Sequence, residues 1–177
     1  MKLSLSWIKD YVNIPEDADL KKLAYDLTMS TVEVEDVEEL ARRFDNMLVG
    51  VIEKIEPHPN ADRLRVCKVD IGGGEIKDIV CGGINLKEGM RVAVSCPGAV
   101  VRWHGEGEPV VIKNSKLRGV ESYGMICASD EIGLGELFPA EQEAEILDLS
   151  AFDVPAGTSL ADALDMNDVL LEIDNKS

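Results

Sequence analysis

From residue 47 onward the chain consists of short apolar stretches separated by turn signals, and no other feature of the sequence limits the fold so strongly. Glycine, proline and asparagine cluster between the stretches, where they set backbone angles that regular strands do not adopt. Short β stretches at this spacing predict a small barrel or a sandwich. We expect five main strands, at residues 48–55, 64–71, 76–81, 91–96 and 124–128, and a shorter one at 110–112.

One of these turn signals, the run Gly72-Gly73-Gly74, also has a functional interpretation. A phosphate-binding loop would end in Gly-Lys-Ser or Gly-Lys-Thr before a helix, and neither feature follows this run. We therefore predict that the three glycines form the turn of a β-hairpin.

The first forty residues have a different pattern. Ser6 can cap a short helix that begins at Trp7, and Asp17 or Asp19 can cap a second helix. Residues 32–38 then alternate between valine and acidic side chains, which predicts an exposed strand. Because so short a segment buries too little surface to form a stable core alone, it needs a partner.

The C-terminal part of the chain offers what the first part lacks. Thr158 or Ser159 can cap a short helix that ends at Leu164, and strands are expected at residues 146–149 and 169–173. We predict an α+β fold in which the two ends of the chain form one domain and a β domain is inserted between them. The predicted boundaries are residues 1–40 plus 150–177 for the discontinuous domain and 41–149 for the inserted domain.

Composition narrows the class of function. No apolar run reaches the roughly 20 residues that span a bilayer, so we expect no membrane partner. The four cysteines have no close metal-ligand spacing, so we predict no metal site and reduced, core-packed thiols in the cytoplasm. No catalytic Ser/His/Asp or Cys/His pairing is evident, and we expect His58, in a proline-flanked turn, to be a surface cap. The cysteines are Cys67, Cys81, Cys96 and Cys127.

The net charge of −16 is unevenly distributed. Residues 1–40 carry 4 basic and 10 acidic side chains, and residues 129–177 carry 1 basic and 13 acidic side chains. Residues 41–128 carry 13 basic and 11 acidic side chains, so only this middle segment can approach a phosphate backbone without net repulsion. Any contact with a nucleic acid must therefore be local.

The basic cluster of Lys113, Lys116 and Arg118 stands between two apolar runs within residues 110–129. Such a cluster in an acidic protein indicates an anionic partner. Charged side chains on strands and turns are equally typical of a solvated surface, where an ion pair contributes only about 0–1 kcal/mol. Both interpretations remain open.

Several motifs, in one order along the chain, resemble the amino-terminal region of bacterial phenylalanyl-tRNA synthetase beta subunits. The resemblance covers nearly the whole chain. The motifs are Leu5-Ser-Trp-Ile-Lys-Asp-Tyr-Val12, Leu27-Thr28, Val34-Glu35, His58-Pro-Asn-Ala-Asp-Arg-Leu-Arg-Val-Cys67, Val80-Cys-Gly-Gly83, Gly98-Ala99, Lys116-Leu-Arg-Gly-Val-Glu-Ser122 and Gly124-Met-Ile-Cys127.

The resemblance implies a five-stranded OB-fold β-barrel of the tRNA-binding type, inserted into a small discontinuous α+β domain. It implies that the chain is a fragment, consistent with its stop directly after the last predicted strand. In that family the beta subunit joins an alpha subunit, which holds the catalytic centre, in an α2β2 assembly. ATP and magnesium then serve the full enzyme, and we expect this fragment to need no cofactor and to be inactive alone.

The expected function is therefore a non-catalytic tRNA-binding and assembly module of phenylalanine–tRNA ligase, which attaches phenylalanine to tRNA. Two alternatives remain: a free-standing OB-fold tRNA-binding protein, disfavoured by the flanking halves, and a purely structural module that packs against other domains or subunits.

The barrel segment holds few aromatic side chains for stacking on bases. We therefore expect weak, salt-sensitive contact with the phosphate backbone and the shape of a folded RNA such as tRNA. The predicted contacts are Arg63, Arg65, Lys113, Lys116 and Arg118, with Asn85 and Ser122 as hydrogen-bonding candidates.

Overall fold

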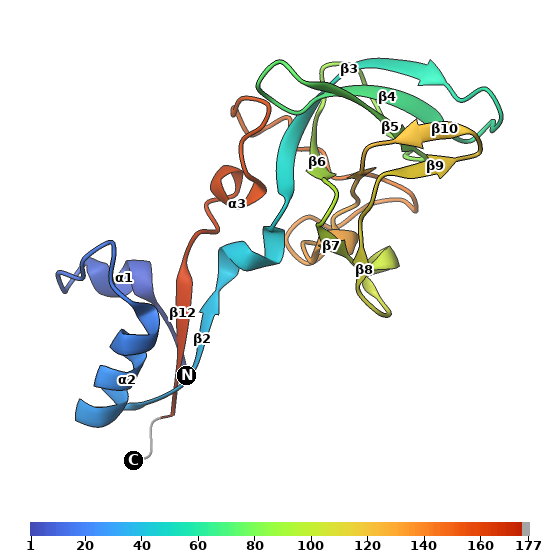
Figure 1. Ribbon diagram of the computed structural model, residues 1–177. Coiled ribbons are helices and arrows are strands. Elements are labelled where there is room, and N and C mark those ends of the chain that lie inside the picture. Colours follow the sequence, from blue (N-terminus) through green and yellow to red (C-terminus); the bar gives the residue numbers. More distant parts are fainter. Residues whose placement is uncertain (175–177) are drawn as a thin grey trace. The chain divides into compact units, whose positions relative to one another are not determined.

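The computed structural model describes residues 1–174, and contacts along the chain divide it into two compact units. The barrel unit is Arg43–Leu164, and the flanking unit is Met1–Arg42 together with the chain from Asp165 onward (Figure 1). The fold is α+β with a five-stranded antiparallel barrel sheet, as predicted.

The barrel sheet has the strand order β11-β6-β3-β4-β5. All five predicted main strands are present, and the shared strand β3 pairs with β6 through its first half and with β4 through its second half. Strand β11 also lies against β5, which brings the two edges of the sheet together. The strands are β3 (Met47–Pro57), β4 (Arg65–Asp70), β5 (Ile76–Cys81), β6 (Arg91–Ser95) and β11 (Met125–Ile126).

The predicted glycine turn joins β4 to β5, and all three of its glycines have positive φ. A residue with a Cβ atom rarely adopts such angles, which explains why glycines occupy the turn. The hairpin interpretation is confirmed.

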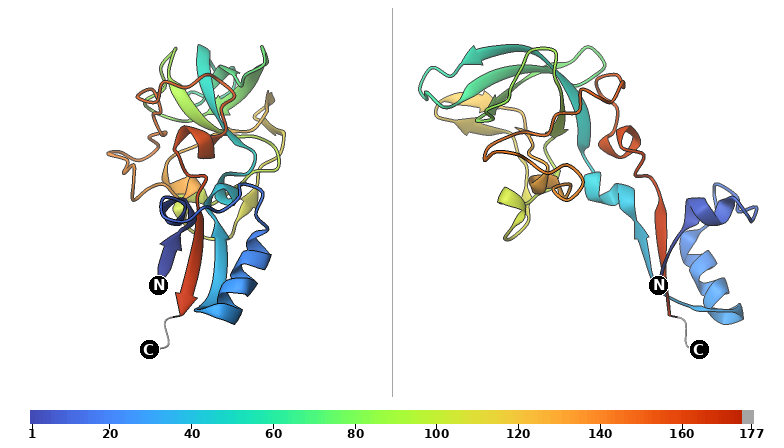
Figure 2. Two further views of the ribbon diagram at one scale, coloured as in Figure 1. Left: turned by 90° about the vertical axis from the view of Figure 1, so that its left-hand side faces the viewer. Right: turned by 180° about the vertical axis from the view of Figure 1, so that it is seen from behind.

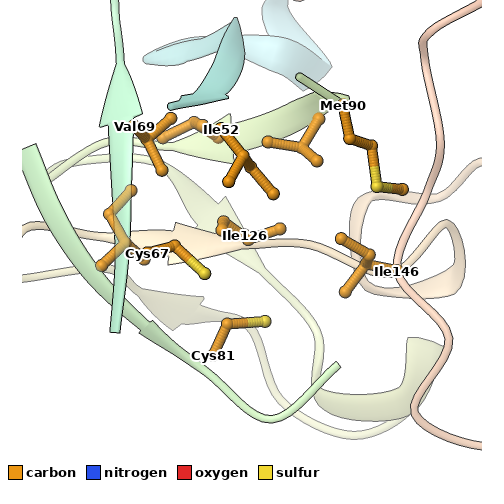
Figure 3. Packing of buried hydrophobic residues seen from close by; sticks show 10 residues of the cluster. Ile52, Cys67, Val69, Cys81, Met90, Ile126 and Ile146 are labelled. Atoms are coloured by element: carbon orange, nitrogen blue, oxygen red, sulfur yellow. The ribbon is translucent and has the colours of Figure 1, made fainter. Parts of the chain in front are cut away.

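Side chains from all five strands fill the barrel (Figure 3). Cys67, Cys81 and Cys127 are buried, as predicted, whereas Cys96 is half-buried. Burial raises the pKa of the Cys67 and Cys127 thiols to about 12 and that of Cys81 to about 11, so these groups remain protonated and unreactive at neutral pH. The core residues are Ile52, Cys67, Val69, Ile79, Cys81, Met90, Val92, Val94, Ile126 and Ile146.

Two short ladders and two short helical turns accompany the barrel sheet. The predicted strand at 110–112 forms β8 and pairs with a strand that was not predicted, β7. Strands β9 and β10 form a hairpin that was not predicted. The elements are β7 (Val100–Val101), η2 (Trp103–Gly105), β8 (Val110–Val111), β9 (Ser115–Leu117), β10 (Val120–Ser122) and η3 (Asp130–Ile132).

The β9–β10 hairpin turns at Arg118 and Gly119, whose φ angles are 47° and 94°. Positive φ at both positions is the geometry of a tight two-residue hairpin turn. The hairpin lies alongside β5 in Figure 1 and in the right-hand view of Figure 2.

His58 fastens this hairpin to the loop after β3. Its Nδ1 accepts a hydrogen bond from the Asn60 backbone N–H at 3.0 Å, which leaves Nε2 to donate to the Leu117 carbonyl at 3.0 Å. The Asn60 side-chain amide donates to the Arg118 carbonyl at 3.0 Å. His58 is only 6% exposed, so the expectation of a surface cap is wrong: the ring is buried by the hairpin that the sequence did not predict.

The structure differs from prediction at the C-terminal boundary of the barrel. Residues 146–149 form no strand and make single backbone bonds instead, such as that from the Leu149 N–H to the Arg91 carbonyl at 2.8 Å. Residues 150–164 belong to the barrel unit, because the Val49 N–H bonds the Thr158 carbonyl and the Gly157 N–H bonds the Val49 carbonyl, both at 2.8 Å. Helix α3 (Leu160–Ala163), capped by Ser159, follows this contact.

The flanking unit is a three-stranded antiparallel sheet in the order β1-β12-β2, with two helices. Asp19, one of the two predicted caps, caps α2, whereas α1 begins two residues earlier than expected because Ser4, not Ser6, is its cap. Leu5, Leu171 and Ile173 form its buried centre. The elements are β1 (Lys2–Ser4), α1 (Leu5–Lys9), α2 (Leu20–Ser30), β2 (Glu33–Glu39) and β12 (Val169–Asp174), and η1 (Leu40–Phe44) follows β2.

No helix within residues 1–174 has the length and apolar character that crossing a bilayer requires.

Asp168 ties the start of the chain to its end within the flanking unit. Its carboxylate accepts hydrogen bonds from the Ser4 hydroxyl, from the Ser6 N–H and hydroxyl, both at 3.0 Å, and from the Val169 N–H at 2.8 Å. Partial burial raises the pKa of Asp168, but these bonds outweigh it, so the pKa lies below its usual value. The carboxylate therefore stabilises the fold at pH values above its unfolded-state pKa of about 3.9. Its contribution to the free energy of unfolding is lost as the pH falls through the folded-state pKa.

We expect Asp168→Asn to lower the free energy of unfolding of the flanking unit by about 1–2 kcal/mol at pH 7, with the difference from the parent chain shrinking below about pH 4. Urea denaturation followed by Trp7 fluorescence in a Trp103→Phe background measures it. Asp26→Asn, which removes an exposed ion pair with Lys22, is the control and should change stability by less than about 0.5 kcal/mol. A difference at pH 7 that persists unchanged at pH 2 would contradict this role.

We expect His58→Asn to lower the free energy of unfolding of the barrel unit by about 1–3 kcal/mol, because the shorter side chain cannot reach both of its backbone partners. Amide hydrogen exchange in β10 should accelerate with it. The control is His104→Asn at the exposed second histidine, whose positive φ asparagine tolerates. Equal effects of the two substitutions would argue against the His58 contacts as the cause.

Candidate nucleic-acid interface

A groove of about 860 Å³ lies where β4 and β5 meet the β9–β10 hairpin, and we refer to it as the strand groove. In an OB barrel the second and third strands, here β4 and β5, usually form part of the ligand-binding face. The groove is lined by Lys68, Ile76, Lys77, Asp78, Asn114, Ser115, Lys116, Glu121, Ser122 and Tyr123.

Two contacts hold the hairpin against β5. The Ser122 hydroxyl accepts a hydrogen bond from the Val80 N–H and donates one to the Gly124 carbonyl, both at 3.0 Å. The Tyr123 N–H donates to the Asp78 carbonyl at 2.9 Å. These bonds fix the β9–β10 hairpin, which forms one side of the strand groove, to strand β5, which forms another.

The groove is locally basic in an acidic protein, since its lining holds three lysines against Asp78 and Glu121. Lys68 pairs with Asp78 at 2.9 Å, and the hydrogen bond in this pair raises the lysine pKa. Lys77 pairs with Glu75 at 2.8 Å, which likewise raises its pKa, and its ammonium lies 4.9 Å from the centre of the Tyr123 ring. Lys68 and Lys77 are therefore fully charged at neutral pH.

Tyr123 supplies the one aromatic ring in the groove lining. A ring beside ammonium groups can stack on one base while the cations contact phosphates. The chemistry of the strand groove therefore suits an anionic ligand with a planar group, and RNA has both features.

The seven predicted contact residues do not lie at one place. Lys116 lines the strand groove, whereas Lys113 lines a different cavity of the barrel unit. Arg63 and Arg118 are exposed on two turns that the Asn60 side chain links. Arg65 is also exposed, but its guanidinium donates to the carbonyls of Asp62 and Leu64 at 2.9 and 3.0 Å.

The two predicted hydrogen-bonding side chains have structural roles instead. Ser122 is 1% exposed, and its hydroxyl already accepts one backbone hydrogen bond and donates another. The Asn85 amide bonds both the N–H and the carbonyl of Ile146 at 2.9 Å, which replaces the strand pairing that residues 146–149 lack. Their polar groups satisfy buried backbone, a use that the sequence pattern does not reveal.

Three of the four cationic and aromatic residues in the groove lining were missed by the sequence analysis: Lys68, Lys77 and Tyr123. A signal for the first was present, because Lys68 interrupts buried neighbours in β4 at the position expected to point outward. The assignment of Tyr123 required the β9–β10 hairpin, which was not predicted.

Within the described residues 1–174, no group of three histidine, cysteine, aspartate or glutamate side chains is close enough to hold a metal ion.

Comparison with known proteins gives matches over the barrel and over the whole chain. The family model described as "Putative tRNA binding domain" matches residues 47–159. The phenylalanine–tRNA ligase beta subunit of Methylococcus capsulatus is 41% identical over 174 residues, that of Coxiella burnetii is 42% identical over 174, and that of Cupriavidus pinatubonensis is 43% identical over 169. These alignments cover 98%, 98% and 95% of this chain, which spans about a fifth of each relative's length.

Among solved structures, a MetRS related protein from Pyrococcus horikoshii aligns with 64% of this chain and 87% of its own, at 24% identity and a TM-score of 0.44. That likeness is too loose to bear on the fold or the site. The family match, in contrast, runs from the first residue of β3 to the cap of α3 and so includes every barrel strand. The chain therefore belongs to the putative tRNA binding domain family, and along nearly all of its length it is similar to bacterial phenylalanine–tRNA ligase beta subunits.

Proposed function

We propose that this chain is the tRNA-binding and assembly module of a phenylalanine–tRNA ligase beta subunit and that the strand groove contacts tRNA. The observation that carries the proposal is the placement of Lys68, Lys77 and Lys116 around one groove on the β4–β5 face of the barrel. Similarity to beta subunits over 98% of the chain includes the flanking unit as well as the barrel, which favours a subunit over a free-standing tRNA-binding protein.

The charges of the groove favour contact with phosphates over reading of bases. Three lysines and one aromatic ring offer several electrostatic contacts but a stacking surface for only one base. Exposed Arg63 and Arg118 extend the cationic surface on the linked turns. A folded RNA recognised by shape and backbone fits these groups better than a single strand does.

The net charge of −16 limits the affinity. A local cationic surface within an acidic protein attracts RNA only at short range, and salt screens that attraction over about 10 Å at 0.1 M ionic strength. We expect weak binding that decreases steeply with salt.

In the longer protein, this module would support the ATP-dependent attachment of phenylalanine to tRNA in the cytoplasm, without supplying catalytic groups. ATP and magnesium would bind outside these residues, and the alpha subunit would be the partner in an α2β2 assembly. The similarity to beta subunits supports this context.

A second candidate is a purely structural packing module. The ion pairs Lys68–Asp78 and Lys77–Glu75 favour it, since lysines that pair with neighbouring carboxylates are also typical of a solvated surface. The two functions differ in whether removal of groove lysines affects tRNA.

We expect the double substitution Lys77→Ala/Lys116→Ala to weaken tRNA binding about 3–30-fold at low salt, because each substitution removes one contact with a phosphate. Each lost contact should also lower the slope of log affinity against log salt concentration by about 1. Fluorescence anisotropy with a labelled tRNA(Phe) transcript at a series of KCl concentrations measures both quantities. Lys9→Ala/Lys21→Ala is the matched control, because it changes the net charge equally on the exposed helices of the flanking unit.

Equal weakening by the two doubles would show that only net charge matters and would contradict a groove-specific site. Binding that is absent, or independent of salt, would remove tRNA binding from the proposed function. Normal aminoacylation by an assembled enzyme that carries the groove double would then favour the packing module.

A further inference from the structure

The barrel unit contains a second hollow of about 690 Å³, which we call the apolar cavity. Buried side chains of Ile112, Ile126 and Ile146 contribute to its lining. Exposed side chains of Trp103, Val111 and Leu117 contribute as well.

These last three side chains are exposed to solvent. Trp103 and Val111 are each 51% exposed, and Leu117 is 41% exposed. Large apolar side chains gathered around one hollow of a protein surface indicate a binding site, because solvent contact with them is unfavourable.

The charges around the apolar cavity have the opposite balance from those of the strand groove. Four acidic residues belong to its lining, against one lysine, Lys113. Phosphates would be repelled from such a lining, whereas ammonium and guanidinium groups would be attracted. The acidic residues are Asp130, Glu131, Glu143 and Glu145.

Three of these carboxylates already accept hydrogen bonds within the chain, and for Asp130 the donor is the Ser129 hydroxyl at 3.2 Å. Glu145 accepts from the Glu141 N–H at 2.7 Å, and Glu131 accepts from the Ala128 N–H at 2.8 Å. Burial nevertheless raises the pKa of Glu131, so a cation beside it would stabilise its charged form. The acidic lining is therefore suited to a cationic ligand.

We propose that the apolar cavity is the docking site for a segment of a partner protein that presents aliphatic side chains flanked by lysine or arginine. The aliphatic side chains would cover Trp103, Val111 and Leu117, and the flanking cations would face the acidic lining. This inference does not rest on tRNA binding, because the cavity shares only Ser115 with the strand groove.

The structure provides a matched pair of valines for a test. Val100 and Val111 are directly opposite each other in the β7–β8 ladder and are 49% and 51% exposed, but only Val111 lines the cavity. Leu137, 62% exposed and in the lining of neither hollow, similarly matches Leu117. The cavity double is Val111→Ser/Leu117→Ser, and the control double is Val100→Ser/Leu137→Ser.

The probe is a fluorescein-labelled twelve-residue peptide of leucine and lysine at helical spacing, titrated with the whole chain and followed by anisotropy. We expect the cavity double to weaken binding at least about tenfold and the control double less than about twofold, since truncation of central apolar contacts accounts for most of the binding energy in such sites. Glu143→Lys should weaken binding about threefold or more. NMR spectra of the backbone amides of each variant establish that the barrel is folded.

Two further peptides separate the contributions to binding. A peptide with serine in place of leucine keeps the charge, and one with glutamate in place of lysine keeps the apolar groups; both should bind at least about tenfold more weakly. Equal binding of the serine peptide would show attraction to the net charge alone and overturn the proposal.

Other occupants of the cavity would give different results. Loss of tRNA affinity in the cavity double, with peptide binding unchanged, would identify an RNA site. A second copy of the chain would be the occupant if the parent chain elutes as a dimer from a size-exclusion column and does not bind the peptide, and if the cavity double elutes as a monomer. Either result would overturn the proposal, and neither depends on whether the groove lysines bind tRNA.

Discussion

The barrel depends on one strand, β3, that belongs to both of its sides. Residues 47–51 pair with β6, residues 51–57 pair with β4, and the register shifts between Ile52 and Lys54. At Gly50 a Cβ atom would lie 2.6 Å from a Val69 methyl and 2.7 Å from a Val94 methyl. The two sides can therefore converge because this position has no side chain, and without that convergence the sheet could not curve around a single core.

The closed barrel separates two surfaces with different chemistry. The strand groove is lined by lysines next to one aromatic ring, and the apolar cavity is lined by exposed aliphatic groups, a tryptophan and carboxylates. A net charge of −16 would oppose RNA if it were spread evenly, but the fold gathers cations on the β4–β5 face. One small domain can thereby offer an anionic and a cationic partner separate sites.

Much of this architecture could be predicted from local patterns. The main strands followed from apolar stretches and turn residues, and Asp19 marked a helix start, because the determinants lie within a few neighbouring residues. The β9–β10 hairpin was missed since its turn includes Arg118 at positive φ, which non-glycine residues seldom adopt. The prediction of a strand at 146–149 was wrong for the opposite reason. The local sequence has the apolar pattern of a strand, but in the structure these residues form only single backbone hydrogen bonds and a side-chain contact with Asn85.

The sequence by itself determined the strand pattern, the basic middle segment and the resemblance that the comparisons confirmed. The tertiary structure alone decided which polar groups line the same hollow and which are buried. Lys113 and Lys116 are three positions apart yet line different hollows, while Lys68 and Lys116 are far apart in sequence and line the same one. Ser122 is buried by backbone partners from β5 and from its own turn. Exposure and proximity arise from the long-range pairing of β strands, which local sequence does not encode.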